Sequence, residues 1–290
     1  MLSRPPRVAA IHDLSGFGRC SLTVAIPILS AMGLQCCPLP TAFLSTHTGG
    51  FQGFTFLDMT EEIPKVSAHW KALGLQFQAI YSGFLGSAEQ IDMVADFIRD
   101  FRRPDTVVVI DPVMGDHGRV YQTYTPAMCR GTAKLAELAQ VITPNLTEAA
   151  LLLDIPYESL VRTEAGWRDV VARLSMDGRR SVVLTGASDG PGRTGAMCFD
   201  AESGRIEAVQ TRRVPREFHG TGDVFSSVLT GALVRGDGLF EAARKAVEFV
   251  RLCGERTAEQ DIPMREGVDF EPLLGLLAPS IREISVNSPR

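Results

Sequence analysis

Apolar positions along this chain alternate between short, nearly continuous runs and longer segments with helical spacing. The runs at 8–11, 106–110 and 181–184 are mainly apolar, which is typical of strands covered on both faces. Segments such as 89–101 repeat apolar residues every three or four positions and predict helices. The predicted strands are 8–11, 35–39, 79–81, 106–110, 141–142, 181–184, 196–199 and 206–211, and the predicted helices are 21–32, 63–73, 89–101, 127–138, 147–153, 164–176, 224–234 and 240–256.

This order of elements predicts an α/β fold. Repeated strand–helix units indicate a mostly parallel central sheet flanked by helices on both faces. The segments 196–199 and 206–211 flank a turn and predict a β-hairpin, which would form an antiparallel edge. Residues 45–56 are rich in glycine and aromatic side chains and suit a loop over a site. With no internal repeat or low-complexity linker, we expect one domain over 1–290, with a core of about 7–256.

Composition narrows the class of protein. The 290 residues carry a net charge of −5 and no basic run, so we expect no nucleic-acid partner. No apolar run reaches the length of a membrane span and the N-terminus lacks a signal-peptide core, so we expect no membrane partner. The six cysteines form neither a disulfide framework nor a zinc pattern. Reduced thiols in a cytoplasmic protein are therefore expected.

Polar residues follow several of the predicted strands directly. Ligands of open α/β sheets bind beyond the carboxyl ends of the strands. Any one of these strand-end groups could be an ordinary polar loop without a function, but together they predict one rim of the sheet that carries a site. The strand-end groups are His12-Asp13, Ser82-Gly83-Phe84, the stretch 111–116 (DPVMGD), Thr143-Pro144-Asn145 and Thr185-Gly186.

The most informative stretch is 219–227, HGTGDVFSS, because two glycines and an aspartate open a helix. Unpaired amides and the macrodipole make a helix start an anion site. Asp223 could be only a capping residue. A kinase, however, needs a base for the attacking hydroxyl beside donors that hold the moving phosphoryl group. At the positive end of a helix, we expect Asp223 to be ionised at neutral pH.

Other phosphate and cofactor motifs fit poorly. A G-x-x-x-x-G-K-[ST] loop is absent, and protein-kinase motifs are absent too. The stretch 190–195 matches G-x-G-x-x-G, but a strand rather than a helix is predicted after it, which disfavours dinucleotide binding. Asp111, Asp116 and Glu148 suit Mg²⁺ bound with a polyphosphate. Glu148 could instead only favour a helix dipole, and Asp111 could only satisfy backbone donors.

Together these motifs resemble the ribokinase superfamily, specifically its pyridoxal/pyridoxamine kinase branch. The similarity runs from Val8 to about Arg256. The motifs, in the family's order, are 45–49 (STHTG), 82–87 (SGFLGS), 111–116 (DPVMGD), 143–148 (TPNLTE) and 220–223 (GTGD).

The resemblance implies ATP-dependent phosphorylation of a hydroxymethyl group on vitamin B6, for salvage of pyridoxal 5'-phosphate. Asp223 would be the base, and a flap at 115–125 would close over the reacting groups. Relatives also imply a homodimer, Mg²⁺ and a monovalent cation such as K⁺. By resemblance, the anion hole is Gly220, Thr221 and Gly222; the nucleotide side is Asp111, Thr143, Glu148, Thr185, Val214 and Thr221; the metal residues are Asp116 and Glu148; and the substrate positions are Asp13, Thr48, Phe84 and Asp223.

The chain departs from the family at the ring pocket. Asp13 replaces a serine, Leu44 an aromatic residue and Phe84 a tyrosine. These changes lie in the ring pocket and leave the residues expected to act on the phosphoryl group unchanged. Kinase activity is therefore still expected, but the substrate could instead be hydroxymethylpyrimidine or another small alcohol. A non-catalytic B6 binder and a nicotinamide oxidoreductase are the remaining alternatives, and the sequence does not indicate which vitamer is preferred.

Overall fold

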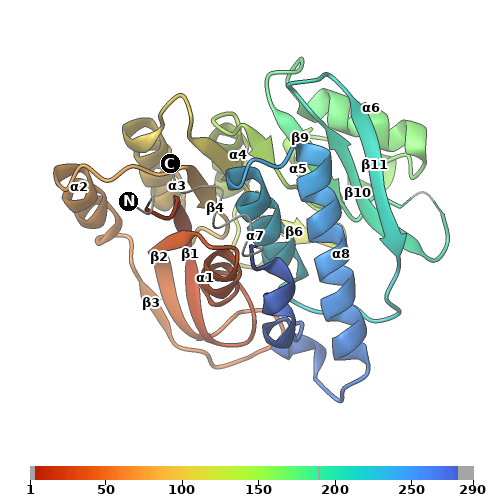
Figure 1. Ribbon diagram of the computed structural model, residues 1–290, viewed down its shortest axis with the longest axis horizontal. Coiled ribbons are helices and arrows are strands. Elements are labelled where there is room, and N and C mark those ends of the chain that lie inside the picture. Colours follow the sequence, from red (N-terminus) through yellow and green to blue (C-terminus); the bar gives the residue numbers. More distant parts are fainter. Residues whose placement is uncertain (1–3, 189, 280–290) are drawn as a thin grey trace, which may run out of the picture.

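The computed structural model describes residues 4–188 and 190–279, and its centre is one large twisted sheet (Figure 1). Within these residues the sheet has nine strands, in the order β11-β10-β9-β8-β5-β4-β1-β2-β3. The strands are β1 (Arg7–Phe17), β2 (Gln35–Thr46), β3 (Phe56–Asp58), β4 (Ala79–Ser82), β5 (Val107–Ile110), β8 (Val141–Ile142), β9 (Ser181–Thr185), β10 (Arg193–Phe199) and β11 (Ile206–Arg212).

The pairing confirms a mostly parallel sheet. Strands β9, β8, β5, β4, β1 and β2 all pair in parallel. At one edge β9 pairs antiparallel with β10, and β10 pairs antiparallel with β11, so the predicted edge hairpin is confirmed. At the other edge β3 pairs antiparallel with β2. The carboxyl ends of six neighbouring parallel strands therefore meet along one rim.

Helices cover both faces of the sheet, as the sequence predicts. One buried cluster joins α1, α7 and α8 to the sheet, and the other joins α2 to α6 to the opposite face. The helices are α1 (Leu22–Ala31), α2 (Ile63–Ala72), α3 (Ala88–Phe101), α4 (Pro126–Ala136), α5 (Leu146–Leu152), α6 (Glu164–Leu174), α7 (Thr221–Val234) and α8 (Leu239–Ala258), and the 3-10 helices are η1 (Tyr157–Ser159), η2 (Met264–Glu266) and η3 (Glu271–Leu277).

Helix α3 shows how local sequence positions these layers. The hydroxyl of Ser87 accepts from the Gln90 amide and caps the first turn, a contact that typically contributes about 1 kcal/mol. The apolar side chains of α3, spaced three and four residues apart, are buried in the hydrophobic cluster on this face of the sheet. The ring of Phe97 stacks on Phe101 at 4.4 Å and meets Phe77 at 6.1 Å. Capping and burial therefore both fix this helix.

Three features go beyond the predicted elements. Strands β1 and β2 run further than 8–11 and 35–39, because buried polar residues such as His12 interrupt the apolar pattern without ending the strand. Strand β3 was not predicted: it begins at Phe56, where the expected loop of 45–56 ends, and its exposed Phe56 and Leu57 lie at the sheet edge. The expected flap contains a small hairpin of β6 (Gly115–Asp116) and β7 (Arg119–Val120).

The C-terminal segment belongs to the packed core as far as the structure describes it. Val268 and Phe270 are fully buried, and η3 packs against α1. Within the described residues, no helix has both the length and the apolar character needed to cross a bilayer.

Candidate active site

The glycine-rich turn before α7 has a geometry that only glycine fits. Gly220 has a φ of 76° and precedes the first residue of the helix. A Cβ at this position would lie 1.9 Å from the carbonyl oxygen of Arg19. Because glycine has no Cβ, the turn packs directly on the 19–21 loop and leaves the first amides of α7 free of helical partners. Thr221 and Gly222 follow it in this first turn, and the Thr221 hydroxyl donates to the Phe218 carbonyl at 3.4 Å.

Asp223 lies in this first turn, and its charge state differs from the sequence expectation. Burial raises its pKa to about 7, the carboxylates of Asp111 and Asp13 add to the rise, and the backbone amide of Ser21 opposes it. A helix start stabilises an anion by about 0.3–1 kcal/mol, whereas three pKa units correspond to about 4 kcal/mol. The expectation of a carboxylate fully ionised at neutral pH was therefore wrong, because desolvation outweighs the dipole.

Asp13 is buried within β1, and both of its carboxylate oxygens accept hydrogen bonds. Its Oδ1 accepts from the Ser21 hydroxyl at 2.5 Å, and its Oδ2 accepts from the Ser15 hydroxyl at 2.8 Å. Burial raises the pKa of Asp13, and the two hydroxyl donors oppose that rise. The neighbouring Cys20 thiol has its pKa raised by burial and by Asp223 and Asp13, so it is a protonated, poor nucleophile.

A buried hydrogen-bond chain links the rim to α7. The Ser226 hydroxyl donates to Asp111 Oδ2 at 3.1 Å and lies 2.9 Å from the Thr143 hydroxyl. Burial raises the pKa of Asp111 to about 7, while Ser226 and Thr143 oppose the rise. Asp111, Thr143 and Asp223 come from three distant parts of the chain, so the fold gathers the predicted rim residues.

Glu148 combines the two alternatives that the sequence left open. Its Oε2 accepts from the Asn145 amide at 2.9 Å, which completes a capping box at the start of α5, and its Oε1 accepts from the Met114 amide at 3.2 Å. It is also buried, and its pKa is raised by burial and then by Asp111. Glu148 is therefore both a cap and a member of the acidic rim.

The candidate metal residues do not by themselves form a ligand cage. Asp116 is exposed on β6 and accepts from the His117 amide at 2.8 Å, and no group of three or more His, Cys, Asp or Glu that could hold an ion occurs among the described residues. The donor set still fits Mg²⁺, which takes one or two carboxylates and completes its shell with phosphates and water. Asp111 and Glu148 are two buried carboxyls whose pKa values burial raises, and Asp111 adds to the rise at Glu148, so a cation here would restore ionisation.

The expected nucleotide side borders a cavity. Thr185, at the end of β9, is bonded to the Pro144 carbonyl through its amide at 2.9 Å. A cavity of about 460 Å³ lies beside it, lined in part by Gly186, Trp167 and Arg213. Val214, next to Arg213, packs over Gly254 of α8, where a Cβ would approach Val214 to 3.3 Å. Thr185 and Val214 thus lie next to residues that line this cavity.

Two of the expected substrate positions, Thr48 and Phe84, lie on loops after β2 and β4. Thr48 is exposed on the loop after β2. Its neighbour His47 accepts from the Gly49 amide through Nδ1 at 3.0 Å, so its Nε2–H donates to the Arg265 carbonyl at 2.6 Å. The ring of Phe84 meets that of Tyr124, at the end of the expected flap, at 6.1 Å. Contacts within the protein therefore fix the loop and Phe84 without engaging Thr48.

Three further residues at the site were missed by the sequence analysis. Ser226 lies three residues after Asp223, so helical spacing could have found it. Tyr121 of the flap is 41% exposed, and desolvation of its hydroxyl together with four nearby carboxylates raises its pKa. The carboxylates are those of Glu148, Asp116, Asp111 and Asp223. Ser21 contacts Asp13 through a backbone conformation that no sequence pattern indicates.

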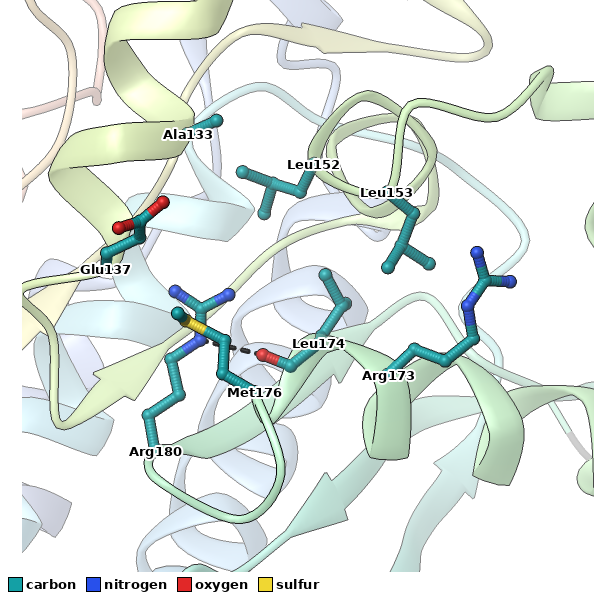
Figure 2. Close-up of a pocket in the computed structure, with 8 residues that line it drawn as sticks. All are labelled: Ala133, Glu137, Leu152, Leu153, Arg173, Leu174, Met176 and Arg180. Carbon is teal, nitrogen blue, oxygen red and sulfur yellow. Dashed lines mark hydrogen bonds between the residues drawn. The ribbon is translucent and has the colours of Figure 1, made fainter.

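A second cavity, of about 160 Å³, lies at the opposite end of the sheet (Figure 2). It is lined by residues at the carboxyl ends of α4, α5 and α6. The buried guanidinium of Arg180 donates to the Leu174 carbonyl at 2.7 Å and the Ala136 carbonyl at 2.5 Å. Burial lowers its pKa to about 10, so it stays charged. Arg180 therefore ties two helix ends together.

Solved structures define the class of protein. An orthorhombic crystal structure, with pyridoxal, of a provisional phosphomethylpyrimidine kinase from Bacteroides thetaiotaomicron VPI-5482 is similar to this chain. The TM-score is 0.89 at 45% sequence identity, over 94% of this chain and 96% of the other. The fold class predicted from sequence, ribokinase-like α/β, is thereby confirmed.

Sequence comparisons give the family. The family model for phosphomethylpyrimidine kinase matches residues 26–264. A pyridoxine/pyridoxal/pyridoxamine kinase from Bordetella bronchiseptica is 30% identical over 88% of this chain and 90% of its own length. A hydroxymethylpyrimidine/phosphomethylpyrimidine kinase from Haemophilus influenzae is 33% identical over 58% of this chain and 61% of its own length. The chain belongs to the phosphomethylpyrimidine kinase family of the ribokinase superfamily and is a kinase, as predicted.

Proposed function

We propose that this protein uses ATP to phosphorylate the 5'-hydroxymethyl group of pyridoxal, pyridoxamine or pyridoxine, in vitamin B6 salvage. One observation carries the proposal: Asp223 lies at an unpaired helix start, within electrostatic reach of Asp13 and Asp111 at the strand-end rim. The Bordetella relative and the pyridoxal-containing Bacteroides structure support the choice of substrate.

In the proposed mechanism, Asp223 accepts the proton of the substrate hydroxyl as its oxygen attacks the γ-phosphorus. A pKa of about 7 suits a base that works near neutral pH. General-base assistance of this kind is typically worth about 100-fold to 10,000-fold. The amides of Gly220, just before α7, and of Thr221 and Gly222 in its first turn donate to the oxygens of the transferring group. One such donor is typically worth about 3–4 kcal/mol.

The nucleotide side is proposed from the remaining rim residues. Asp116 and Glu148 would hold Mg²⁺ together with the phosphates. When bound, Mg²⁺ cancels charge between the phosphate groups. A monovalent cation such as K⁺ is a further proposal that rests on the family alone. The residues proposed to line the nucleotide are Asp111, Thr143, Glu148, Thr185, Val214 and Thr221.

Asp13, Thr48 and Phe84 are proposed to face the substrate ring. Each oxygen of Asp13 has taken one hydroxyl donor, and a carboxylate oxygen has room for a second. Such an acceptor suits a hydroxyl or an amine on the substrate ring, and both a B6 vitamer and a pyrimidine alcohol can carry one of these groups. Hydroxymethylpyrimidine is therefore the second candidate substrate, favoured by the similarity to the Haemophilus kinase.

A panel of ring alcohols tests this proposal. The purified protein is incubated with ATP and Mg²⁺ and with pyridoxal, pyridoxamine, pyridoxine or hydroxymethylpyrimidine, and ADP release is measured. We expect release that depends on a B6 vitamer. Release with hydroxymethylpyrimidine alone would shift the assignment to the second candidate, and no release above the alcohol-free rate with any of them would refute the kinase substrate class.

We also propose one domain over 1–290, a homodimer and a cytoplasmic location. The two buried hydrophobic clusters pack on opposite faces of the same sheet, which supports a single domain. The β2–β3 edge exposes Phe43, Phe56 and Leu57, and exposed apolar edges suit a partner. Unpaired cysteines among the described residues support a reducing compartment. Light scattering of the protein as it elutes from a size-exclusion column tests the dimer, because it measures whether the mass is that of one chain or of two.

A further inference from the structure

Ser21, between β1 and α1, has an unusual backbone for a residue with a side chain. Its φ is 54° and its ψ is −128°. This is the mirror image of ordinary extended backbone, which glycine adopts readily and other residues rarely do. Such a conformation persists where the surrounding structure holds it in place, and it is concentrated at functional sites.

Contacts on both sides hold Ser21 in this conformation. Its hydroxyl donates to Asp13 Oδ1 at 2.5 Å. Its carbonyl accepts from the amides of Val24 at 3.0 Å and Ala25 at 2.9 Å, which starts α1. Ser21 is therefore fixed between a buried carboxylate and the first turn of a helix.

The same loop packs against the turn that carries the base. The carbonyl oxygen of Arg19 lies 1.9 Å from where a Cβ on Gly220 would stand, and the Cys20 sulfur lies 3.6 Å from that point. The backbone amide of Ser21 lowers the pKa of Asp223 and so favours its charged form. A shift of the 19–21 loop would therefore displace the start of α7 and, with it, Asp223.

We propose that Ser21 is a positioning residue for the phosphoryl transfer: its hydroxyl anchors the 19–21 loop to Asp13, and the loop in turn holds the glycine-rich turn and the helix start that carry Asp223. The inference rests on the proposed function, because it gives Asp223 the role of base. Asp13 then acts as an anchor of the base as well as a substrate position. The anchoring explains why a strained residue is kept next to the glycine-rich turn.

Asp223 is surrounded by several groups that also affect its titration. Besides the Ser21 amide, the carboxylates of Asp13 and Asp111 act on it directly. The Cys20 thiol, the Tyr81 hydroxyl of β4 and the Tyr121 hydroxyl of the flap interact with it in turn. A test of Ser21 therefore needs a control that changes Asp13 equally and leaves the loop in place.

Ser15 provides that control, because its hydroxyl donates to the other oxygen of Asp13 at 2.8 Å. Ser21→Ala and Ser15→Ala each remove one donor from Asp13, but only the first frees the 19–21 loop. We expect kcat of Ser21→Ala to fall about tenfold or more below that of Ser15→Ala, since small misplacements of a reacting group cost up to about 100-fold. The KM for ATP should be the same in both, because the nucleotide side is untouched.

The pH profile adds a readout that a purely structural defect would not move. Loss of the Ser21 amide from Asp223 disfavours the charged base, so the acid limb of kcat/KM should lie at higher pH in Ser21→Ala than in Ser15→Ala. Ser21→Gly is made in parallel, because it also removes the hydroxyl but adopts this backbone conformation without strain. It guards against the case in which Ser21→Ala fails to fold. Thermal unfolding checks that each variant is folded.

Equal kcat values and equal acid limbs in the Ser21 and Ser15 variants would overturn the positioning role. That result differs from failure of the proposed function, in which the unsubstituted protein itself shows no alcohol-dependent ADP release.

Discussion

Replacing Asp223 with Asn should stabilise the protein at alkaline pH while removing its activity. The folded protein holds the Asp223 proton up to a pKa of about 7, whereas the ordinary pKa of an aspartate is 3.8. Folding therefore takes up a proton between these two values. Stability contributed by the protonated group is present at low pH and is lost as pH rises through this window.

The structure sets the size of the effect. A shift of about three units corresponds to about 4 kcal/mol when the group is fully ionised. Asp111 and Asp13 share this cost with Asp223, because neighbouring carboxyls titrate together. We therefore expect Asp223→Asn, which carries no charge at any pH, to be about 2–4 kcal/mol more stable at pH 8. At about pH 4 or below, the difference should nearly vanish, because Asp223 is then also neutral.

Thermal unfolding without ligands measures this difference. For a chain of this size, we expect Tm of Asp223→Asn to exceed that of the unsubstituted protein by about 4–16 °C at pH 8, at about 2–4 °C per kcal/mol. Asp92→Asn, on the exposed face of α3, is the matched control and should leave Tm unchanged. A Tm for Asp223→Asn below that of the unsubstituted protein at pH 8 would refute the argument that burial of this carboxylate costs stability.

Further predictions concern the base, the far end of the sheet and a close packing contact. In the unsubstituted protein, kcat/KM should fall about tenfold per pH unit below a pKa of about 7 for Asp223, and a rate that is flat from about pH 5 to 8 would contradict this. Arg180→Met should cost about 2–4 kcal/mol in thermal unfolding, since it leaves the Leu174 and Ala136 carbonyls without their donor, whereas kcat of the folded fraction should not change. Gly83→Ala would put a Cβ 2.2 Å from His12 Nδ1. We therefore expect it to displace the loop before Phe84 and raise KM for the alcohol more than KM for ATP, and equal changes in both would argue against a substrate role for this loop.

The sequence was informative where periodicity and turn chemistry act locally. The parallel core follows from runs such as 106–110, and the antiparallel edge follows from the turn between 199 and 206, both of which the structure confirms. The glycines before α7 indicated a helix start, and Gly220 does precede its first residue. The gathering of Asp111 and Thr143 follows from the parallel strands β5 and β8, which end at one rim.

Other features depend on tertiary contacts that local patterns do not encode. Strand β1 continues through buried His12 and Asp13, so its polar end looks like a loop in sequence. The pKa of Asp223 depends on burial and on two carboxylates, Asp13 in β1 and Asp111 directly after β5, which no local motif predicts. The positive φ of Ser21 likewise depends on contacts with Asp13, eight residues earlier, and with the first turn of α1.

The central claim is that Asp223 serves as the base for phosphoryl transfer to a ring hydroxymethyl group. Its most direct test is ³¹P NMR of reactions that contain ATP, Mg²⁺ and pyridoxal, run side by side with the unsubstituted protein and with Asp223→Asn. The account predicts a phosphate monoester at the 5'-hydroxymethyl position with the former, and formation at least about 100-fold slower with the latter. Equal rates of monoester formation in the two reactions would contradict it.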